Sequence, residues 1–266
     1  MAETSPVDGL VLREDGPLRW IILDRDARGN SLTPGMRNRI VDELAAAHAD
    51  HDVRALVITA RGKRFCTGAD ISGRSGGERV AGDVGEMIRS GAQRLFRAVW
   101  ECEKPVVCGL NGTAAGIGAH LALACDLVVA ARSAKLIEIF TRRGLIPDGG
   151  GAYLLPRLVG PQKAKELFFF ADDVPAVEAE RLGLVNRVVD DDALEAAVSE
   201  WGHRLAAGPT RAYAFTKRMV NASLDTDLDG AFATEATLVE VNLHTDDMRE
   251  GMAAFAERRE PEFTGR

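Results

Sequence analysis

The chain has 266 residues, of which 46% are hydrophobic and 27% charged, and its formal net charge is −7. Such a length can bury one large core with an appendage. The acidic balance argues against a nucleic-acid partner, because binding to the phosphate backbone needs a basic face, although a local basic pocket for a phosphorylated ligand is still allowed. The four cysteines show no C-x-x-C spacing and the first residues lack the features of a secretory signal, so we expect a cytoplasmic protein.

One apolar span, residues 112–131, is long enough to cross a bilayer. His120, Asp126 and several glycines interrupt it. We therefore expect a buried helix followed by a buried strand, and no membrane partner.

The start of the chain predicts a β-hairpin followed by an amphipathic helix. Two strand-like runs, residues 10–12 and 18–23, flank a turn sequence at residues 14–17. Thr33 can cap a helix that has Pro34 at its first position, and apolar residues then recur at helical spacing.

A strand is then predicted at residues 54–60, running into a glycine-containing turn at residues 62–68. Residues 72–85 are polar and glycine-rich, which is typical of a loop over a binding site. A helix follows, up to residue 102.

The stretch from residue 105 to residue 140 repeats this order. A buried strand at 105–110 leads through glycine turns into a short helix at 119–124, and a second strand follows at 127–130. The order strand, helix, strand implies crossover connections and parallel pairing. Helices are then predicted at 161–170 and 174–182.

The chain after residue 190 is expected to be purely helical, following a last strand at 184–189. Asp192 is expected to cap a helix, Pro209 to start another, and residues 227–259 to form a single long helix. This change in composition divides the chain into a core, residues 1–192, and a C-terminal helical region, residues 193–266.

The glycine-rich turns predict a place to hold an oxygen anion. A glycine turn at the start of a helix exposes bare backbone N–H groups that face the positive end of the helix dipole. The glycines at 116 and 118 and at 68 have this arrangement, although glycines there could equally serve tight packing of strand on helix.

Three motifs in a fixed order resemble the crotonase (enoyl-CoA hydratase/isomerase) superfamily: FCTGADI at residues 65–71, NGTAAGIG at 111–118 and GLIPDGG at 144–150. The resemblance covers almost the whole chain. It implies an α/β fold built as a spiral of ββα units, with a C-terminal helical region used for trimer formation. It also implies a homotrimer or a dimer of trimers that acts on an acyl-CoA thioester in lipid metabolism, with coenzyme A as part of the substrate rather than a separate cofactor.

The resemblance further implies an oxyanion hole made of two backbone N–H groups. The matching positions are Ala69 and Ile117, with Gly116 as the alternative second donor. Chemistry next to the thioester carbonyl puts negative charge on its oxygen, and each prealigned donor there is worth roughly 3–4 kcal/mol.

The two glutamates of similar hydratases are replaced here by His120 and Phe140. Hydration needs one group to take a proton from water and another to deliver one to carbon, and Phe140 can do neither. Glu138 lies two residues earlier and, by strand alternation, on the same face as Phe140. His120 is either an acid/base group or a core histidine bonded to a backbone carbonyl.

Asp148 is the predicted catalytic carboxylate, because isomerase branches of the family have an acidic residue at this position. A single base can carry one proton from C2 to C4. The alternative is a structural cap for the helix that follows. We thus predict a Δ3,Δ2-enoyl-CoA isomerase; a hydratase or other thioester reaction using His120 or Glu138, and a CoA-thioester-binding protein without catalysis, are the alternatives.

Four residues match positions that contact coenzyme A in relatives: Arg25 and Arg28 near the nucleotide, and Phe255 and Arg258 near the adenosine phosphate. Each arginine could equally be a solvated surface charge. No metal site is expected. Five further residues complete the predicted substrate site: Gly68, Asp70, Ile71, Phe140 and Leu145.

Overall fold

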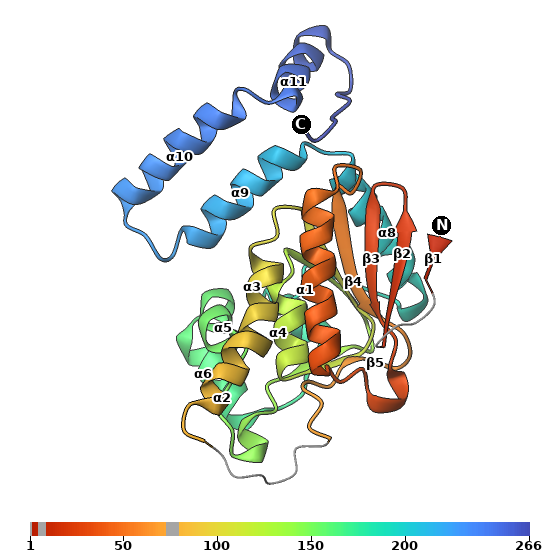
Figure 1. The fold of residues 1–266 in the computed structure, drawn as a ribbon, viewed down its shortest axis with the longest axis vertical. Coiled ribbons are helices and arrows are strands. Elements are labelled where there is room, and N and C mark those ends of the chain that lie inside the picture. Colours follow the sequence, from red (N-terminus) through yellow and green to blue (C-terminus); the bar gives the residue numbers. More distant parts are fainter. Residues whose placement is uncertain (1, 5–8, 73–79) are drawn as a thin grey trace.

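The computed structural model describes residues 2–4, 9–72 and 80–266 (Figure 1). The loop predicted at residues 72–85 lies partly outside these residues, and its last three positions already belong to a helix. The strands are β1 (Ala2–Glu3), β2 (Leu10–Asp15), β3 (Leu18–Leu23), β4 (Ala55–Ala60), β5 (Arg64–Cys66), β6 (Val106–Leu110), β7 (Thr113–Ala115), β8 (Leu127–Ala131), β9 (Lys135–Ile137), β10 (Val174–Pro175) and β11 (Arg187–Val189).

The α-helices are α1 (Pro34–Ala49), α2 (Asp83–Ile88), α3 (Arg94–Trp100), α4 (Ile117–Ala124), α5 (Gly151–Val159), α6 (Pro161–Phe170), α7 (Ala176–Arg181), α8 (Leu194–Ala206), α9 (Thr210–Ala222), α10 (Leu228–Asn242) and α11 (Asp246–Glu257). Short helical turns η1 (Asp26–Arg28), η2 (Arg89–Gln93), η3 (Thr141–Arg143) and η4 (Asp191–Ala193) connect them.

The larger sheet has seven strands in the order β1-β2-β3-β4-β6-β8-β11. The predicted hairpin is confirmed, because β2 and β3 pair antiparallel with Leu10 opposite Leu23. From β3 to β11 every neighbouring pair is parallel, as the alternation of strands and helices predicted.

The smaller sheet has four strands in the order β10-β9-β7-β5. Each of β4, β6 and β8 in the larger sheet continues into β5, β7 or β9 of the smaller one, and a helix follows before the next unit begins. The repetition of this ββα unit gives the spiral that was expected.

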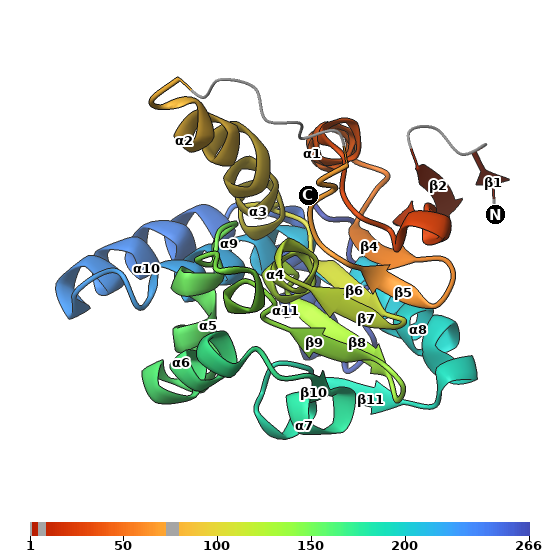
Figure 2. The same ribbon diagram turned by 90° about the horizontal axis from the view of Figure 1, so that it is seen from below.

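Helices cover both faces of the larger sheet. α8 packs against β4, β6 and β8 on one face, while α1, α3 and α4 pack together on the other (Figure 2). Apolar side chains from both faces form one core, and Trp20 and Phe65 are its largest fully buried members. α8 lies on the sheet, and the helices that extend from the core are α9, α10 and α11 (Figure 1).

Helix starts were predicted well where a side chain caps the backbone. Thr33 accepts a hydrogen bond of 3.1 Å from the Met36 amide, as expected. The single helix over residues 227–259 is wrong, because the Thr245 side chain caps a new helix by accepting from the Met248 amide at 3.1 Å. Asp192 is not a cap, since it lies inside the turn η4 and α8 begins after it.

The apolar span at residues 112–131 is divided between the short strand β7, the helix α4 and the strand β8. Over the described residues, no helix has the length and apolar character needed to cross a bilayer.

Candidate active site

The pairing of β5 with β7 brings the first two glycine motifs together. Cys66 is paired with Ala114, and Ala69 and Ile117 each lie three residues further on. Because parallel strands end at the same edge of a sheet, both residues leave at that edge. Gly68 has φ = +103° and lies so close to β7 that a Cβ atom on it would be 3.1 Å from the carbonyl oxygen of Ala115.

The backbone around Ala69 is held by Leu32, which leaves the Ala69 amide free. The Leu32 amide donates to the Gly68 carbonyl at 2.8 Å, and the Asp70 amide donates to the Leu32 carbonyl at 3.0 Å. In such a parallel bridge the N–H group of the central residue points to the opposite side. Within the described chain, the Ala69 N–H donates to no other group.

The amide of Ile117 is the second free donor. Ile117 is the first residue of the buried helix α4, and its N–H likewise has no acceptor among the described residues. The alternative donor Gly116 is not available, because its N–H donates to the Ile137 carbonyl at 3.0 Å. Gly116 has φ = +55°, a value at which a side chain would be strained.

His120 lies one turn further along α4 and forms a buried pair with Glu138. The Nε2 atom of His120 is 2.9 Å from the Oε2 atom of Glu138, and the two residues are 2% and 6% exposed. The expected partner for a purely structural histidine was a backbone carbonyl; the partner found is a carboxylate. The ring of Phe140 stacks on the imidazole, with 5.3 Å between ring centroids and 16° between planes, so both Glu138 and Phe140 meet His120.

The other imidazole nitrogen of His120 faces a turn rich in glycine. Nδ1 is buried and has no hydrogen-bond partner among the described residues. A Cβ atom added to Gly149 would be 3.7 Å from Nδ1 and 3.2 Å from the Cγ2 atom of Ile117, and one added to Gly151 would be 2.1 Å from Nε2. The turn therefore fits against His120 only because these residues have no side chain.

Asp148 immediately precedes this turn and is half-buried. The N-cap residue of α5 is Gly150, so Asp148 does not occupy the N-cap position of this helix. The chain thus has a carboxylate beside Gly149, a residue on which an added Cβ atom would approach both Ile117 and His120.

The structure brings together two of the residues expected near coenzyme A. A guanidinium nitrogen of Arg25 lies 2.6 Å from Asp70, one residue after Ala69. Hydrogen bonds from the Ser72 hydroxyl and amide, together with Arg25, lower the pKa of Asp70 to about 2. Arg28 is exposed on the neighbouring turn η1. Ile71 and Leu145 are exposed as well, whereas Phe140 is buried.

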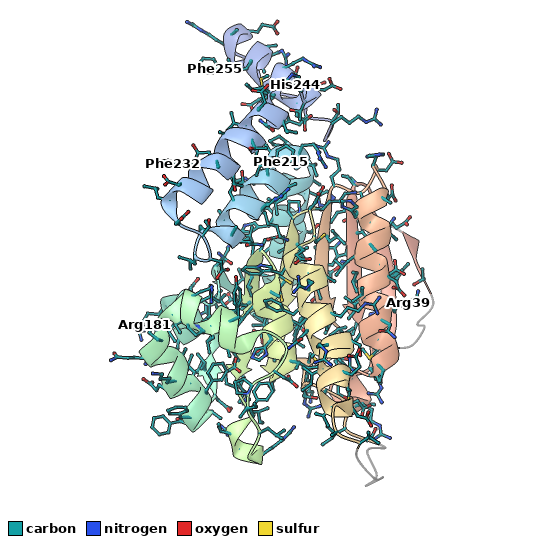
Figure 3. The ribbon with its side chains drawn as sticks, turned by 60° about the vertical axis from the view of Figure 1, so that its left-hand side comes forward. Arg39, Arg181, Phe215, Phe232, His244 and Phe255 are labelled. Carbon is teal, nitrogen blue, oxygen red and sulfur yellow. The ribbon has the colours of Figure 1, made fainter. Side chains whose placement is uncertain are left out.

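Phe255 and Arg258 are not brought to this place. They belong to the end of α11, at the opposite end of the molecule from β5 (Figure 1), and Figure 3 shows Phe255 on the outside of this helix. The Phe255 side chain is 83% exposed. Within one chain, these two residues are therefore separate from Arg25 and Arg28.

One residue that organises the site was missed from the sequence. Asn30 is fully buried; its side-chain amide donates to the carbonyls of Arg61 and Arg64, and its oxygen accepts from the Arg25 amide at 2.7 Å. It fixes the loop that carries Arg25 against β5. Its signal is the pair Gly29–Asn30, where both residues have positive φ.

Comparison with known proteins agrees with this geometry. Residues 15–266 match the family model described as "Enoyl-CoA hydratase/isomerase". A probable enoyl-CoA hydratase of Rhodobacter capsulatus is 39% identical, covering 94% of this chain and 95% of its own. A 1,2-epoxyphenylacetyl-CoA isomerase of Escherichia coli is 35% identical, covering 92% of this chain and 94% of its own. The crystal structure of a putative enoyl-CoA hydratase from Streptomyces coelicolor superposes with a TM-score of 0.91 at 35% identity, covering 100% of this chain and 98% of that one.

Proposed function

The chain belongs to the enoyl-CoA hydratase/isomerase family, and from this premise we propose that it moves a double bond of an enoyl-CoA from C3–C4 to C2–C3. The proposal depends above all on Asp148, a half-buried carboxylate that immediately precedes the turn against His120. One base suffices for this reaction, because it can remove a proton from C2 and return it to C4. The Escherichia coli relative, which is named an isomerase of a CoA thioester, supports isomerisation.

The two free amides supply the other half of the mechanism. The thioester carbonyl oxygen accepts hydrogen bonds from the N–H groups of Ala69 and Ile117. Asp148 takes the proton from C2, and the electron pair of that bond forms a C1–C2 double bond while the carbonyl oxygen becomes negative. When the carbonyl re-forms, the double bond moves to C2–C3, and C4 takes the proton back from Asp148. The amides favour this path because they bind the dienolate oxygen more strongly than the neutral carbonyl.

Arg28 and the Arg25–Asp70 pair are proposed to meet the coenzyme A moiety at the edge of this site. Phe255 and Arg258 can join them only where α11 of one copy lies against another copy. Exposed apolar side chains on α9, on α10 and in the turn between them support contact between copies, as a homotrimer or a dimer of trimers. Light scattering of the purified protein tests this. The side chains are Val220, Leu224, Leu228 and Phe232.

Hydration of an enoyl-CoA is the second candidate, and the observation in its favour is the His120–Glu138 pair. Water addition needs two groups that handle protons. A carboxylate bonded to Nε2 fixes the histidine tautomer and leaves Nδ1 to act on water, and Asp148 lies next to the same turn. In this candidate the pair takes over the work of the two glutamates of similar hydratases, although Phe140 and not Glu138 occupies the second of their positions.

Turnover of trans-3-hexenoyl-CoA and crotonyl-CoA, measured side by side, separates the candidates. The variants are Asp148→Asn, which keeps the shape of the side chain, and His120→Asn. Isomerisation that is lost in Asp148→Asn, with little hydration of crotonyl-CoA, is the expected result. In D2O, a single base that holds its proton gives product in which C4 retains much of the hydrogen from C2.

Hydration that survives Asp148→Asn but is lost in His120→Asn would instead assign the second candidate. If the unaltered protein binds both thioesters but converts neither, the result would support the third possibility, a CoA-thioester-binding protein without catalysis. In that case neither substitution would change any rate.

A further inference from the structure

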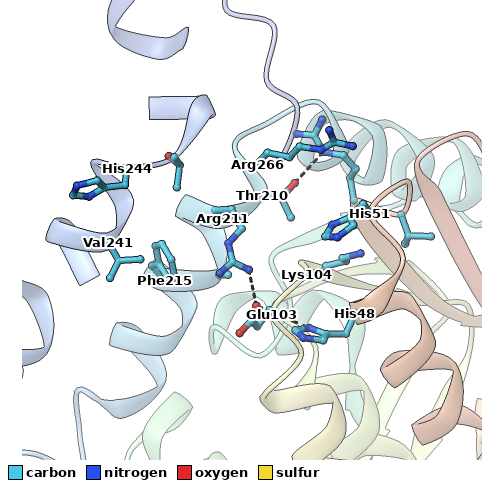
Figure 4. A pocket seen from close by; sticks show the side chains of 15 residues that line it. His48, His51, Glu103, Lys104, Thr210, Arg211, Phe215, Val241, His244 and Arg266 are labelled. Atoms are coloured by element: carbon cyan, nitrogen blue, oxygen red, sulfur yellow. Dashed lines mark hydrogen bonds and ion pairs between the residues drawn. The ribbon is translucent and has the colours of Figure 1, made fainter. Parts of the chain in front are cut away.

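A second pocket lies at the edge of the larger sheet opposite the candidate active site, where β4 and β6 begin. It has a volume of about 450 Å³, which is in the range of sites for small molecules. Its walls come from the end of α1, the start of α9, the end of α10 and the last residues of the chain (Figure 4). We call it the basic pocket; its charged and histidine side chains are His48, His51, Arg54, Glu103, Lys104, Arg211, His244 and Arg266.

The charge of the basic pocket is opposite to that of the whole protein. Glu103 is the one acidic residue among its lining residues, against three arginines, a lysine and three of the five histidines of the chain, although the net charge of the chain is −7. A concave site with low-dielectric walls focuses such a field and concentrates anions.

Among the described residues, Arg54 and Lys104 are bonded only to neutral groups. The guanidinium of Arg54 donates to the carbonyls of Gly208 and Phe263 and to the Thr210 hydroxyl. The ammonium of the buried Lys104 donates to the carbonyls of Ala47 and Asp50. These bonds hold the cations in place without neutralising them.

The nearest carboxylates behind these cations are already engaged. Asp50 pairs with Arg19 at 3.1 Å, and the buried Asp247 accepts from the amides of Thr264 and Gly265. Desolvation is the main cause that lowers the pKa of both Arg54 and Lys104, and it outweighs the attraction of Asp247 and Asp50. A bound anion would offset the desolvation that disfavours the charged forms of Arg54 and Lys104.

The remaining basic side chains of the pocket lie at or near the surface. Glu103 lies between Arg211, at 2.9 Å, and His48, at 3.9 Å, and so shares one negative charge between two partners (Figure 4). Among the described residues, neither His51 nor Arg266 forms an ion pair. Figure 4 shows both on the same side of the pocket as Lys104.

The wall across from Lys104 and His51 carries apolar side chains as well as His244. Figure 4 shows Phe215 and Val241 there, and the guanidinium of Arg211 lies 5.2 Å from the centre of the Phe215 ring. A ligand that fills the pocket therefore has an anionic group at one end and an apolar part at the other. Arginine forks match the oxygens of a phosphate group better than they match a single charge.

We propose that the basic pocket binds the phosphate group of a small organic phosphate, with His51, Arg211 and Arg266 around the phosphate and the organic part against Phe215. This site is independent of the thioester reaction proposed above. It lies at the other edge of the sheet from Ala69 and Asp148, and it is tested by binding alone.

Calorimetric titration of the intact protein with phenyl phosphate, at low ionic strength, tests the proposal. We expect saturable binding of phenyl phosphate that is tighter than binding of inorganic phosphate and of benzoate. Arg266→Gln and His51→Gln should each weaken it about tenfold, as expected for the loss of a charge-assisted hydrogen bond. Both residues lie at the surface, so the fold should tolerate these changes.

Two controls each remove one positive charge elsewhere. Arg204→Gln alters an exposed arginine of α8 that lines none of this pocket, and Arg28→Gln alters the proposed coenzyme A edge. Both should leave the affinity for phenyl phosphate unchanged. The proposal is overturned by the absence of saturable binding, by equal losses in the control variants, or by benzoate binding as tightly as phenyl phosphate. It is also overturned if Arg266→Gln changes the oligomeric state but not the affinity, since a second copy would then occupy the pocket.

Discussion

Glu138 is hydrogen-bonded to the imidazole of His120, with its Oε2 atom 2.9 Å from Nε2, and both side chains are almost fully buried. The two residues come from different units of the spiral, and each is the nearest polar partner of the other. A carboxylate in this position orients a histidine ring and fixes which nitrogen carries the proton.

Substitution of Glu138 tests how much its hydrogen bond to His120 contributes to the stability of the fold. Glu138→Ala leaves a buried imidazole nitrogen unsatisfied and should lower the free energy of unfolding by about 1–3 kcal/mol. Glu138→Gln keeps the shape and one hydrogen bond, so it should cost less. Urea denaturation of the three proteins measures this. Equal stability of Glu138→Ala and the unaltered protein would show that the pair contributes nothing to the fold.

The proposed oxyanion hole can be tested although it is made of backbone. Ile117 is the first residue of α4, where proline fits the helix; it removes an N–H group that has no acceptor in the described chain, and part of a buried side chain as well. Ile117→Pro should reduce kcat for isomerisation by about 100- to 1,000-fold, the usual effect of losing one such donor. Ile117→Val keeps the amide and is the control. An unchanged kcat in a folded Ile117→Pro protein would rule out this amide as a donor.

Close approach of α4 to β5 makes Gly118 irreplaceable. A Cβ atom there would be 2.3 Å from the Cys66 carbonyl oxygen, so Gly118→Ala should push the two elements apart and destabilise the protein by about 1–3 kcal/mol. Gly35 is the matched control, because it lies in α1, where an added Cβ atom would make only an ordinary contact, 3.7 Å from the Thr33 hydroxyl oxygen. Gly35→Ala should stabilise the protein by about 0.5–1 kcal/mol. Thermal melting of both variants should therefore show shifts of opposite sign.

The four cysteines should be inert in the folded protein. All are buried, and desolvation raises the pKa of Cys66 to about 12, so its thiolate is scarce at pH 8. We expect almost no reaction with a thiol reagent such as DTNB under native conditions. In guanidinium chloride, each protein chain should release four equivalents of thionitrobenzoate. Rapid native labelling of Cys66 would contradict the packing of β5 against α4.

Local features could be predicted from the sequence, whereas contacts between distant residues could not. The hairpin of β2 and β3 and the cap at Thr33 depend on neighbouring residues, and both were found. The break at Thr245 was missed because apolar spacing continues on both sides of it, although Thr245 followed by two aspartates is itself a cap signal.

The candidate site shows the same limit. The family motifs indicated Ala69, Asp148 and a choice between Gly116 and Ile117, but the choice needed the bond from Gly116 to Ile137, which comes from another strand. The pairing of Glu138 with His120 likewise depends on how two units of the spiral are stacked. No periodicity in either segment reveals it.

The hydrogen bonds of the Arg54 side chain limit the order in which parts of the protein can fold during synthesis. This residue stands just before β4, in the first quarter of the chain, yet its three acceptors lie 154, 156 and 209 positions later. During synthesis on the ribosome the N-terminal strands emerge long before these partners, so the guanidinium must remain hydrated until the segment at Gly208 and Thr210 emerges, and its last bond forms only after Phe263 has left the exit tunnel. The edge of the larger sheet is therefore among the first parts of the protein to be made and among the last to be closed.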